Sequence, residues 1–241
     1  YVPWLRLERA SIAAAHAWYA PGLRGMAKGS RAIANWDEDA VTMAVEAARG
    51  CASAPPATVY LASTSLPFAD RQNAGIVKEA LALGDATATM DITGSQRAGV
   101  SALIMALKAG EPALCIAAEK ARPQPGSEAE MTSGDGAAAI SVGTGDAIAD
   151  VLAHHCISVD FVDHFRATGS DFAYGWEQRW VRDEGYAKIA PRAAAAALHA
   201  AGIDAGVVNH FCFAAPIKGV AAAIAKKIGL PETSADTSLD T

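Results

Sequence analysis

The residue types that acid–base and group-transfer chemistry needs gather in residues 158–186, where charged and aromatic side chains mix without a helix or strand period. His164 suits general acid–base work near neutral pH, because the intrinsic pKa of histidine is about 6.5. Arg166 suits a two-pronged contact with a carboxylate or phosphate, and Trp176 adds an aromatic surface. We interpret this segment as a functional loop or cap over a sheet, and the alternative is an irregular surface held by salt bridges.

The serine and cysteine side chains provide weaker candidates for a catalytic nucleophile. Ser95 precedes an expected helix whose first N–H groups would favour an anion, but a hydroxyl without a neighbouring base is a poor nucleophile, so we interpret Ser95 mainly as a small packing residue. Cys115 and Cys212 lie in apolar runs and are expected to be buried, as small hydrophobic residues. The four cysteines form no C-x-x-C pair, which argues against disulfides and a cysteine-based zinc site and favours a reducing, cytoplasmic compartment.

Short apolar runs and longer helix-like segments alternate along the chain and must position these residues. Expected strands lie at 59–64, 88–93, 113–118, 137–142 and 211–214. Expected helices lie at 38–49, with Asp37 as a candidate N-cap, and at 74–83, 97–108, 187–201 and 220–228. Because the strands are apolar on both faces, the pattern predicts an α/β protein whose sheet is covered by helices on each side.

Length, charge and hydropathy limit the function. The 241 residues suffice for one large domain or two small ones, and Gly143–Asp150 is the expected seam between a half at 1–145 and a half at 146–241. The net charge is −6 and the charged residues are scattered singly along the chain, which argues against nucleic acid as a partner. No apolar stretch reaches the roughly 18 residues of a membrane span. No phosphate-binding glycine motif follows a strand, so a nucleotide-binding protein is disfavoured.

Four groups of residues, taken together and in order, resemble the thiolase superfamily, in the branch of hydroxymethylglutaryl-CoA synthase and ketoacyl synthase III. They are Ala62–Ala69 leading to Asp91–Gly99, Ser133–Ala139 with its Gly-Asp-Gly-Ala turn, Phe213–Pro216 followed by Lys226–Leu230, and the pocket-like segment Asp160–Arg166. The resemblance implies a five-layered αβαβα architecture of two similar βαβαβ-type halves, dimers, and coenzyme A thioesters as substrates. Family chains also have an opening strand and C-terminal strands that this sequence is expected to lack.

Matched residue by residue, the chain departs from the family at its reactive positions. Gln96 stands where the resemblance places the nucleophilic cysteine, and Thr64 stands where the synthases have an acid–base glutamate. Ala214 replaces a histidine, and Ile217 replaces an asparagine. An amide cannot form an acyl thioester, and alanine cannot move a proton. Gln96 therefore suggests a decarboxylating variant, a non-catalytic partner subunit, or a side chain that only fills the start of a helix.

The resemblance implies an acyl-CoA-handling protein with acyl-transfer or Claisen-type carbon–carbon bond chemistry and an atypical active site. The expected catalytic residues are Gln96, Ser95, Thr64 and His164, and the expected contacts to substrate or coenzyme A are Arg97, Arg166, Trp176 and Lys218. No tightly bound cofactor and no metal are expected. A homodimer or heterodimer is expected, and relatives imply a zinc-bearing OB-fold protein as a further partner. The alternative function is a silent or decarboxylating subunit of a condensing complex.

Overall fold

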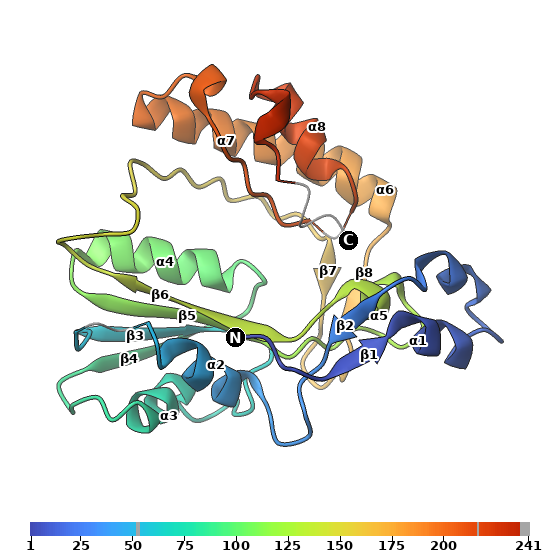
Figure 1. Ribbon diagram of the computed structural model, residues 1–241, viewed down its shortest axis with the longest axis horizontal. Helices are drawn as coiled ribbons and strands as arrows, with labels where there is room; N and C mark the ends of the chain where they lie inside the picture. The colour runs from blue at the N-terminus through green and yellow to red at the C-terminus, as the bar shows by residue number, and fades with distance from the viewer. Residues whose placement is uncertain (52–53, 216, 237–241) are drawn as a thin grey trace. The chain divides into compact units, whose positions relative to one another are not determined.

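A four-stranded sheet in the order β4-β3-β5-β6 is the centre of the first part of the chain (Figure 1). Its strands are β3 (Thr58–Ala62), β4 (Ala88–Ile92), β5 (Ala113–Glu119) and β6 (Gly136–Val142). The strand β3 pairs in parallel with β4 and with β5, while β6 runs antiparallel to β5. These four strands confirm four of the predicted apolar runs.

The computed structural model describes residues 1–51, 54–215 and 217–236. The chain divides into two compact units, Tyr1–Ile148 and Ala149–Thr241, and this boundary lies within the seam predicted at 143–150. Each unit is described by itself below. No helix in the described ranges is both long enough and apolar enough to cross a membrane.

Helices cover both faces of the sheet in the first unit, as predicted. The helices are α2 (Ala40–Ala48), α3 (Asn73–Ala80) and α4 (Ala98–Ala109). Val59 and Leu61 of β3 pack in one apolar cluster with residues of α2 and α3, while Tyr60 and Ala62 pack in another with α4. This alternation follows from the two-residue period of a strand, which sends successive side chains to opposite faces.

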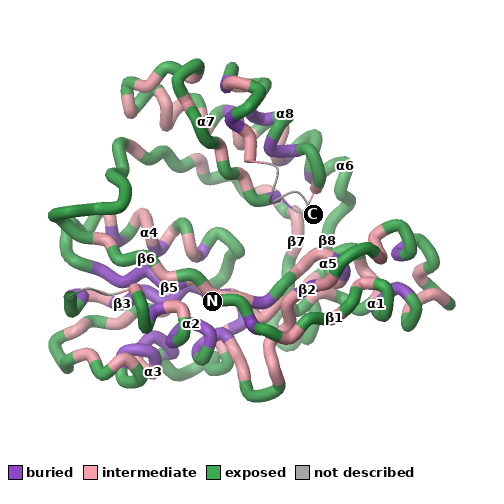
Figure 2. The backbone as a smooth tube through the Cα atoms, in the orientation of Figure 1, coloured by how far each residue is buried: buried purple, intermediate pink, exposed green. Residues whose placement is uncertain are grey.

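Burial on both faces holds for the two inner strands but not for the edges. Figure 2 shows the buried backbone concentrated in β3, β5 and α2. In the edge strands, Met90 of β4 is 41% exposed and Ile140 of β6 is 52% exposed. The prediction of uniformly buried strands was therefore wrong for β4 and β6, because each has a neighbouring strand on one side only.

A small subdomain precedes and flanks the sheet within the first unit. It comprises β1 (Arg6–Glu8) paired antiparallel with β2 (Ser30–Ala32), together with α1 (Arg9–Ala15), η1 (Pro21–Met26) and α5 (Glu128–Thr132). Its own core contains Ile12, Leu23 and Met131. Sequence analysis missed these elements because they are too short to show a period.

The second unit contains the hairpin β7 (His164–Phe165) and β8 (Tyr174–Gly175), then α6 (Gln178–Trp180) and the wide helical turn η2 (Val181–Tyr186). These are followed by α7 (Ala187–Ala201), η3 (Ala205–Val207), α8 (Val220–Lys227) and η4 (Glu232–Ser234). The helix α7 has the predicted bounds. Residues 158–186, interpreted as a functional loop or cap, thus include a hairpin and a helix.

Two local predictions were wrong. The run 211–214 forms no strand: Phe211 makes one isolated bridge to Ala235, and the rings of Phe211 and Phe213 stack and pack beside Tyr186. The N-cap of α2 is Asp39 rather than Asp37, because Asp39 accepts from the N–H of Thr42 while the Thr42 hydroxyl accepts from the N–H of Asp39. This reciprocal capping sets the first turn two residues later than predicted.

Candidate active site

The carboxyl ends of the parallel strands bring three chain segments to one edge of the sheet. Ala62 in β3 lies opposite Ile92 of β4 on one side and Ala117 of β5 on the other. The residues that leave these strands, including Thr64, the turn 93–97 and Glu119, therefore emerge at the same edge. This is the edge at which open α/β sheets usually bind ligands.

Thr64 and Glu119 form a direct pair at this edge. The backbone N–H of Thr64 donates to Glu119 Oε2 at 2.9 Å, and the Thr64 hydroxyl donates to Glu119 Oε1 at 3.0 Å. The two bonds fix the plane of a partly buried carboxylate. Thr64 thus stands where the resembled synthases have a glutamate, but it holds a carboxylate that another strand supplies.

Glu119 is a candidate functional residue that sequence analysis missed. The signal was present, because an acidic residue directly follows the apolar run 113–118. The contact between Glu119 and Thr64 could not be recognised from the sequence, because 55 residues separate them and only the strand register makes β3 and β5 neighbours.

Gln96 lies in an exposed turn between β4 and α4, beside the first turn of that helix. Gly94 opens the turn with a φ of +86°, a conformation that glycine adopts without strain. Gly99, three residues after Gln96, packs so closely on β5 that a Cβ there would lie 3.1 Å from the Cβ of Ala117. The turn that carries Gln96 is therefore held near the end of β5, since Ala117 is only two residues before Glu119 in that strand.

Ser95 and Arg97 flank Gln96 and are also exposed. The Ser95 hydroxyl accepts a hydrogen bond of 3.1 Å from the backbone N–H of Arg97, and the Ser95 carbonyl accepts from the N–H of Ala98. The interpretation of Ser95 as a packing residue was wrong, because Ser95 is exposed and its hydroxyl accepts from the N–H of Arg97, the N-cap residue of α4. Among the described residues, the contact of this hydroxyl is to a backbone N–H and not to a base.

A buried carboxylate holds the loops behind this edge. Asp135, in the Gly-Asp-Gly-Ala turn, is 7% exposed. It accepts from the N–H of Ala34 at 2.7 Å and from the N–H of Ala121 at 2.9 Å. The Lys120 ammonium donates to the carbonyl of Glu38 at 2.8 Å. These contacts join three segments that are distant in sequence and fix the loop that follows Glu119.

In the second unit, His164 is paired with the carboxylate beside it. Asp163 Oδ1 lies 2.7 Å from His164 Nδ1 and 2.8 Å from the backbone N–H of His164. The hydrogen bond from His164 holds the pKa of Asp163 below its ordinary value. If Nδ1 is the donor, Nε2 of the neutral ring carries the lone pair and can accept a proton.

The remaining predicted contact residues of the second unit are exposed. Trp176 is 46% exposed and packs edge-on against Tyr174, while Arg166 and Lys218 are exposed at the ends of their segments. Ala214 and Ile217 are described, whereas Pro216, the last residue of the Phe213–Pro216 motif, lies outside the described residues.

The cysteines offer no thiolate that matches the missing nucleophile. Burial raises the pKa of the Cys115 thiol to about 11, and its Sγ faces the carbonyl of Ala102 in α4. Cys212, expected to be buried, is exposed because residues 211–214 form no strand. Among the described residues, no three His, Cys, Asp or Glu side chains form a group that could hold a metal ion.

Comparisons with known proteins point to one superfamily. The chain is 31% identical over 229 residues to a hydroxymethylglutaryl-CoA synthase of Methanocella arvoryzae, covering 90% of this chain and 65% of that protein. It is 32% identical over 161 residues to the Methanocaldococcus jannaschii synthase, covering 62% of this chain and 46% of the relative. The chain therefore spans less than two thirds of the length of these curated relatives. No protein-family model matches it.

Solved structures show the same fold. The 3-oxoacyl-(acyl carrier protein) synthase III of Pseudomonas aeruginosa superposes with a TM-score of 0.77 at 20% identity, covering 96% of this chain and 78% of that one. The HMG synthase of the curacin biosynthetic pathway, in complex with acetyl donor-ACP, gives a TM-score of 0.78 at 20% identity, and the match covers 95% of this chain and 60% of that one. The resemblance read from the sequence and the α/β fold class are thereby confirmed.

Proposed function

We propose that this chain, which resembles hydroxymethylglutaryl-CoA synthases in sequence and shares the fold of 3-oxoacyl synthases III, is a thiolase-like protein that acts on acyl-CoA thioesters. The proposed reaction is an acyl transfer that makes or breaks a carbon–carbon bond. The observation that carries the proposal is the pairing of Thr64 with Glu119 at the strand edge from which the Gln96 turn also emerges.

Without sulfur at position 96, this position cannot hold the acyl group covalently. Gln96 instead donates from its side-chain amide to the thioester carbonyl as negative charge develops on the oxygen, and the N-terminal N–H groups of α4 add to that stabilisation. Glu119, held by Thr64, takes the proton from the carbon next to the carbonyl. The product of this step is an enolate, the species that attacks in carbon–carbon bond formation and that loss of CO2 from a malonyl thioester also produces.

The other expected residues complete the proposal. In the first unit, Arg97 binds the phosphates of coenzyme A. In the second unit, contacts of Arg166, Lys218 and Trp176 with the substrate stay a prediction from the resemblance. His164 moves a proton at Nε2, and Ser95 holds the Gln96 turn. The substrate is a coenzyme A thioester, with no tightly bound cofactor and a cytoplasmic location.

A catalytically silent or decarboxylating partner subunit is the second candidate function. The exposed amide of Gln96 favours it, because an amide can bind a thioester carbonyl without turning it over. In that case the protein works as a heterodimer with an active condensing subunit, or with a zinc-bearing OB-fold protein. A homodimer suits the first candidate.

The test follows α-proton exchange of acetyl-CoA in deuterated water by NMR, and CO2 release from malonyl-CoA, with the purified protein. Gln96→Ala should slow exchange about 100-fold or more, and Glu119→Gln by a similar or larger factor. Gln124→Ala is the matched control, because the Gln124 side chain is exposed and its described contact is made by its backbone carbonyl.

The outcomes separate the candidates. Exchange that both variants abolish supports an active enzyme. Coenzyme A thioester binding that Gln96→Ala weakens, with no exchange and no CO2 in the unmodified protein, supports the silent subunit. Exchange or decarboxylation at an unchanged rate in Gln96→Ala excludes the proposed role of Gln96.

A further inference from the structure

The missing nucleophile at position 96 raises the question of which other side chain in the chain has a base beside it. The Ser95 hydroxyl accepts a backbone N–H, and the Cys115 thiol is buried with a pKa of about 11. Cys156 and Cys212 are exposed. Tyr19 differs from all of these, because its hydroxyl contacts an imidazole that is itself paired with a carboxylate.

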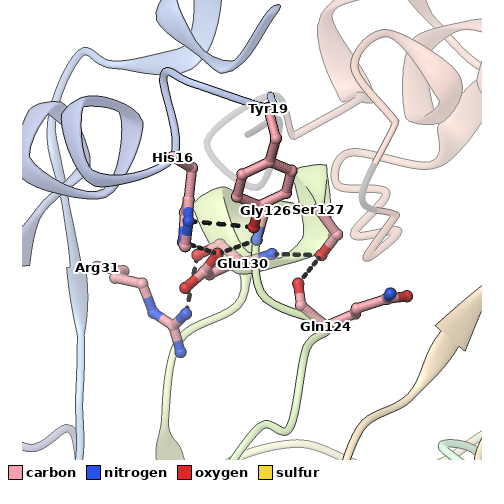
Figure 3. Close-up of polar contacts among 7 residues, drawn as sticks. All are labelled: His16, Tyr19, Arg31, Gln124, Gly126, Ser127 and Glu130. Carbon is pink, nitrogen blue, oxygen red and sulfur yellow. Dashed lines mark hydrogen bonds and ion pairs between the residues drawn. The ribbon is translucent and has the colours of Figure 1, made fainter. Parts of the chain in front are cut away.

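Figure 3 shows this arrangement, which we name the Tyr19–His16–Glu130 cluster. Tyr19 Oη lies 3.1 Å from His16 Nδ1, and His16 Nε2 lies 3.1 Å from Glu130 Oε2. The side chains of His16 and Glu130 are only 19% and 20% exposed, whereas Tyr19 is 45% exposed. The cluster thus runs from a half-buried carboxylate to a phenol that solvent can reach.

The hydrogen bonds are consistent with one direction of proton transfer. An ionised Glu130 only accepts, so the neutral His16 ring donates from Nε2 and presents the lone pair of Nδ1 to the Tyr19 hydroxyl. The phenol then donates to Nδ1. This is the order of nucleophile, base and carboxylate that activates hydroxyl nucleophiles in group-transfer enzymes.

Neighbouring residues hold Glu130 and Tyr19 in place. Glu130 Oε2 also accepts from the N–H of Gly126 at 2.6 Å, and the Arg31 guanidinium donates to the Glu130 carbonyl at 2.8 Å. Gly126 has a φ of +75°, and a Cβ at this position would overlap the Tyr19 hydroxyl. Arg31 of β2 is 8% exposed, and it bonds to the backbone of Glu130 in α5 rather than to the Glu130 carboxylate.

We propose that Tyr19 is an activated nucleophile that accepts an acyl group from reactive esters and thioesters. The Tyr19 oxygen attacks the acyl carbon, and His16 Nδ1 takes the phenol proton while Glu130 stabilises the imidazolium. The carbon–sulfur bond of the thioester breaks, and His16 returns the proton to the departing thiolate. Acyl thioester and phenol thus yield an acyl ester on Tyr19 and a free thiol, with no oxidant or other reactant.

For coenzyme A thioesters as the donor, this inference rests on the proposed function. For a small activated ester as the donor, the inference is independent of the proposed function, because such an ester needs no coenzyme A binding site. The probe is therefore p-nitrophenyl acetate first and acetyl-CoA second. A protein that reacts with the ester but not with acetyl-CoA retains the activated tyrosine and lacks the coenzyme A site, so failures of the two proposals are distinguished.

The experiment measures nitrophenolate release by absorbance and the acetylated residue by intact mass and peptide mapping at neutral pH. In the unmodified protein we expect one acetyl group, on Tyr19. Tyr19→Phe should abolish it. His16→Asn, which keeps a polar partner but cannot take the proton, should slow acetylation about 100-fold or more. Glu130→Gln should slow it about tenfold or more, because the imidazolium loses its carboxylate.

Tyr1→Phe is the matched control, because the Tyr1 hydroxyl is bonded to the Glu38 carboxylate rather than to an imidazole, and Tyr1 is 41% exposed. Acetylation should be unchanged in this variant. Circular dichroism confirms that each variant is folded. The proposal is overturned if folded Tyr19→Phe is acetylated as fast as the unmodified protein, if the label is spread over lysines and Tyr1, or if His16→Asn reacts at an unchanged rate.

Discussion

Replacement of Asp135 by Asn tests how the structure holds the loops behind the candidate active site. The buried carboxylate accepts two backbone N–H groups, from Ala34 and Ala121. Asparagine keeps one carbonyl oxygen, so it can accept one of them, but its NH2 group then faces the second donor. An unsatisfied buried donor costs about 1–3 kcal/mol. We therefore expect Asp135→Asn to lower the free energy of unfolding by about 2 kcal/mol.

The magnitude is large enough to measure. A loss of about 2 kcal/mol lowers the folding equilibrium constant roughly 30-fold. Asp135→Ala removes both acceptors and should cost about twice as much. Urea unfolding followed by tryptophan fluorescence gives the free energies, and amide hydrogen exchange resolved by NMR identifies the N–H groups that lose protection.

Asp37→Asn is the matched control, because Asp37 is exposed in the same unit and its substitution should change stability by less than about 0.5 kcal/mol. The reasoning is refuted if Asp135→Asn unfolds at the same urea concentration as this control. It is also refuted if stability falls while the amides of Ala34 and Ala121 exchange as slowly as before.

Three further predictions follow from other contacts. Asp39→Ala removes a reciprocal cap and should destabilise the fold by about 1 kcal/mol in urea unfolding; an unchanged midpoint would contradict the capping role. Because burial raises the pKa of Cys115 to about 11, iodoacetamide at pH 8 should label exposed Cys156 and leave Cys115 unlabelled until the protein unfolds, as peptide mass spectrometry would reveal. The pKa of Asp163 is lowered, first by the hydrogen bond from His164, so this carboxylate stabilises the fold above its unfolded pKa and loses that contribution as the pH falls through its folded pKa. Asp163→Asn should therefore lose less stability than the unmodified protein below about pH 4. Identical acid unfolding curves for the two proteins would count against this prediction.

Much of the fold could be predicted from periodicity. The strands β3, β4, β5 and β6 and the helices α2, α4 and α7 follow apolar spacing that reports which faces are buried. The strand expected at 211–214 failed because an apolar run of that length does not specify whether it joins a sheet or, as Phe211 and Phe213 do, packs its rings against a neighbouring helix.

The candidate site was predicted less completely. Gln96 and Thr64 could be named because their positions in motifs are local features of the sequence. Glu119 could not, because its importance lies in the register of β3 with β5. The Tyr19–His16–Glu130 cluster was missed for the same reason, since 114 residues separate His16 from Glu130.

The sequence by itself determined the strands of the central sheet and the longer helices, since these depend on residue type and local spacing. It also determined that an amide stands at position 96, where the family resemblance places a thiol. Only the tertiary structure decided which polar groups meet. A carboxylate contacts a hydroxyl or an imidazole when strand register and helix packing bring their atoms within about 3 Å, and contacts between distant segments leave no local pattern. The physical reason is that hydrogen bonds are short-ranged in space and indifferent to separation along the chain.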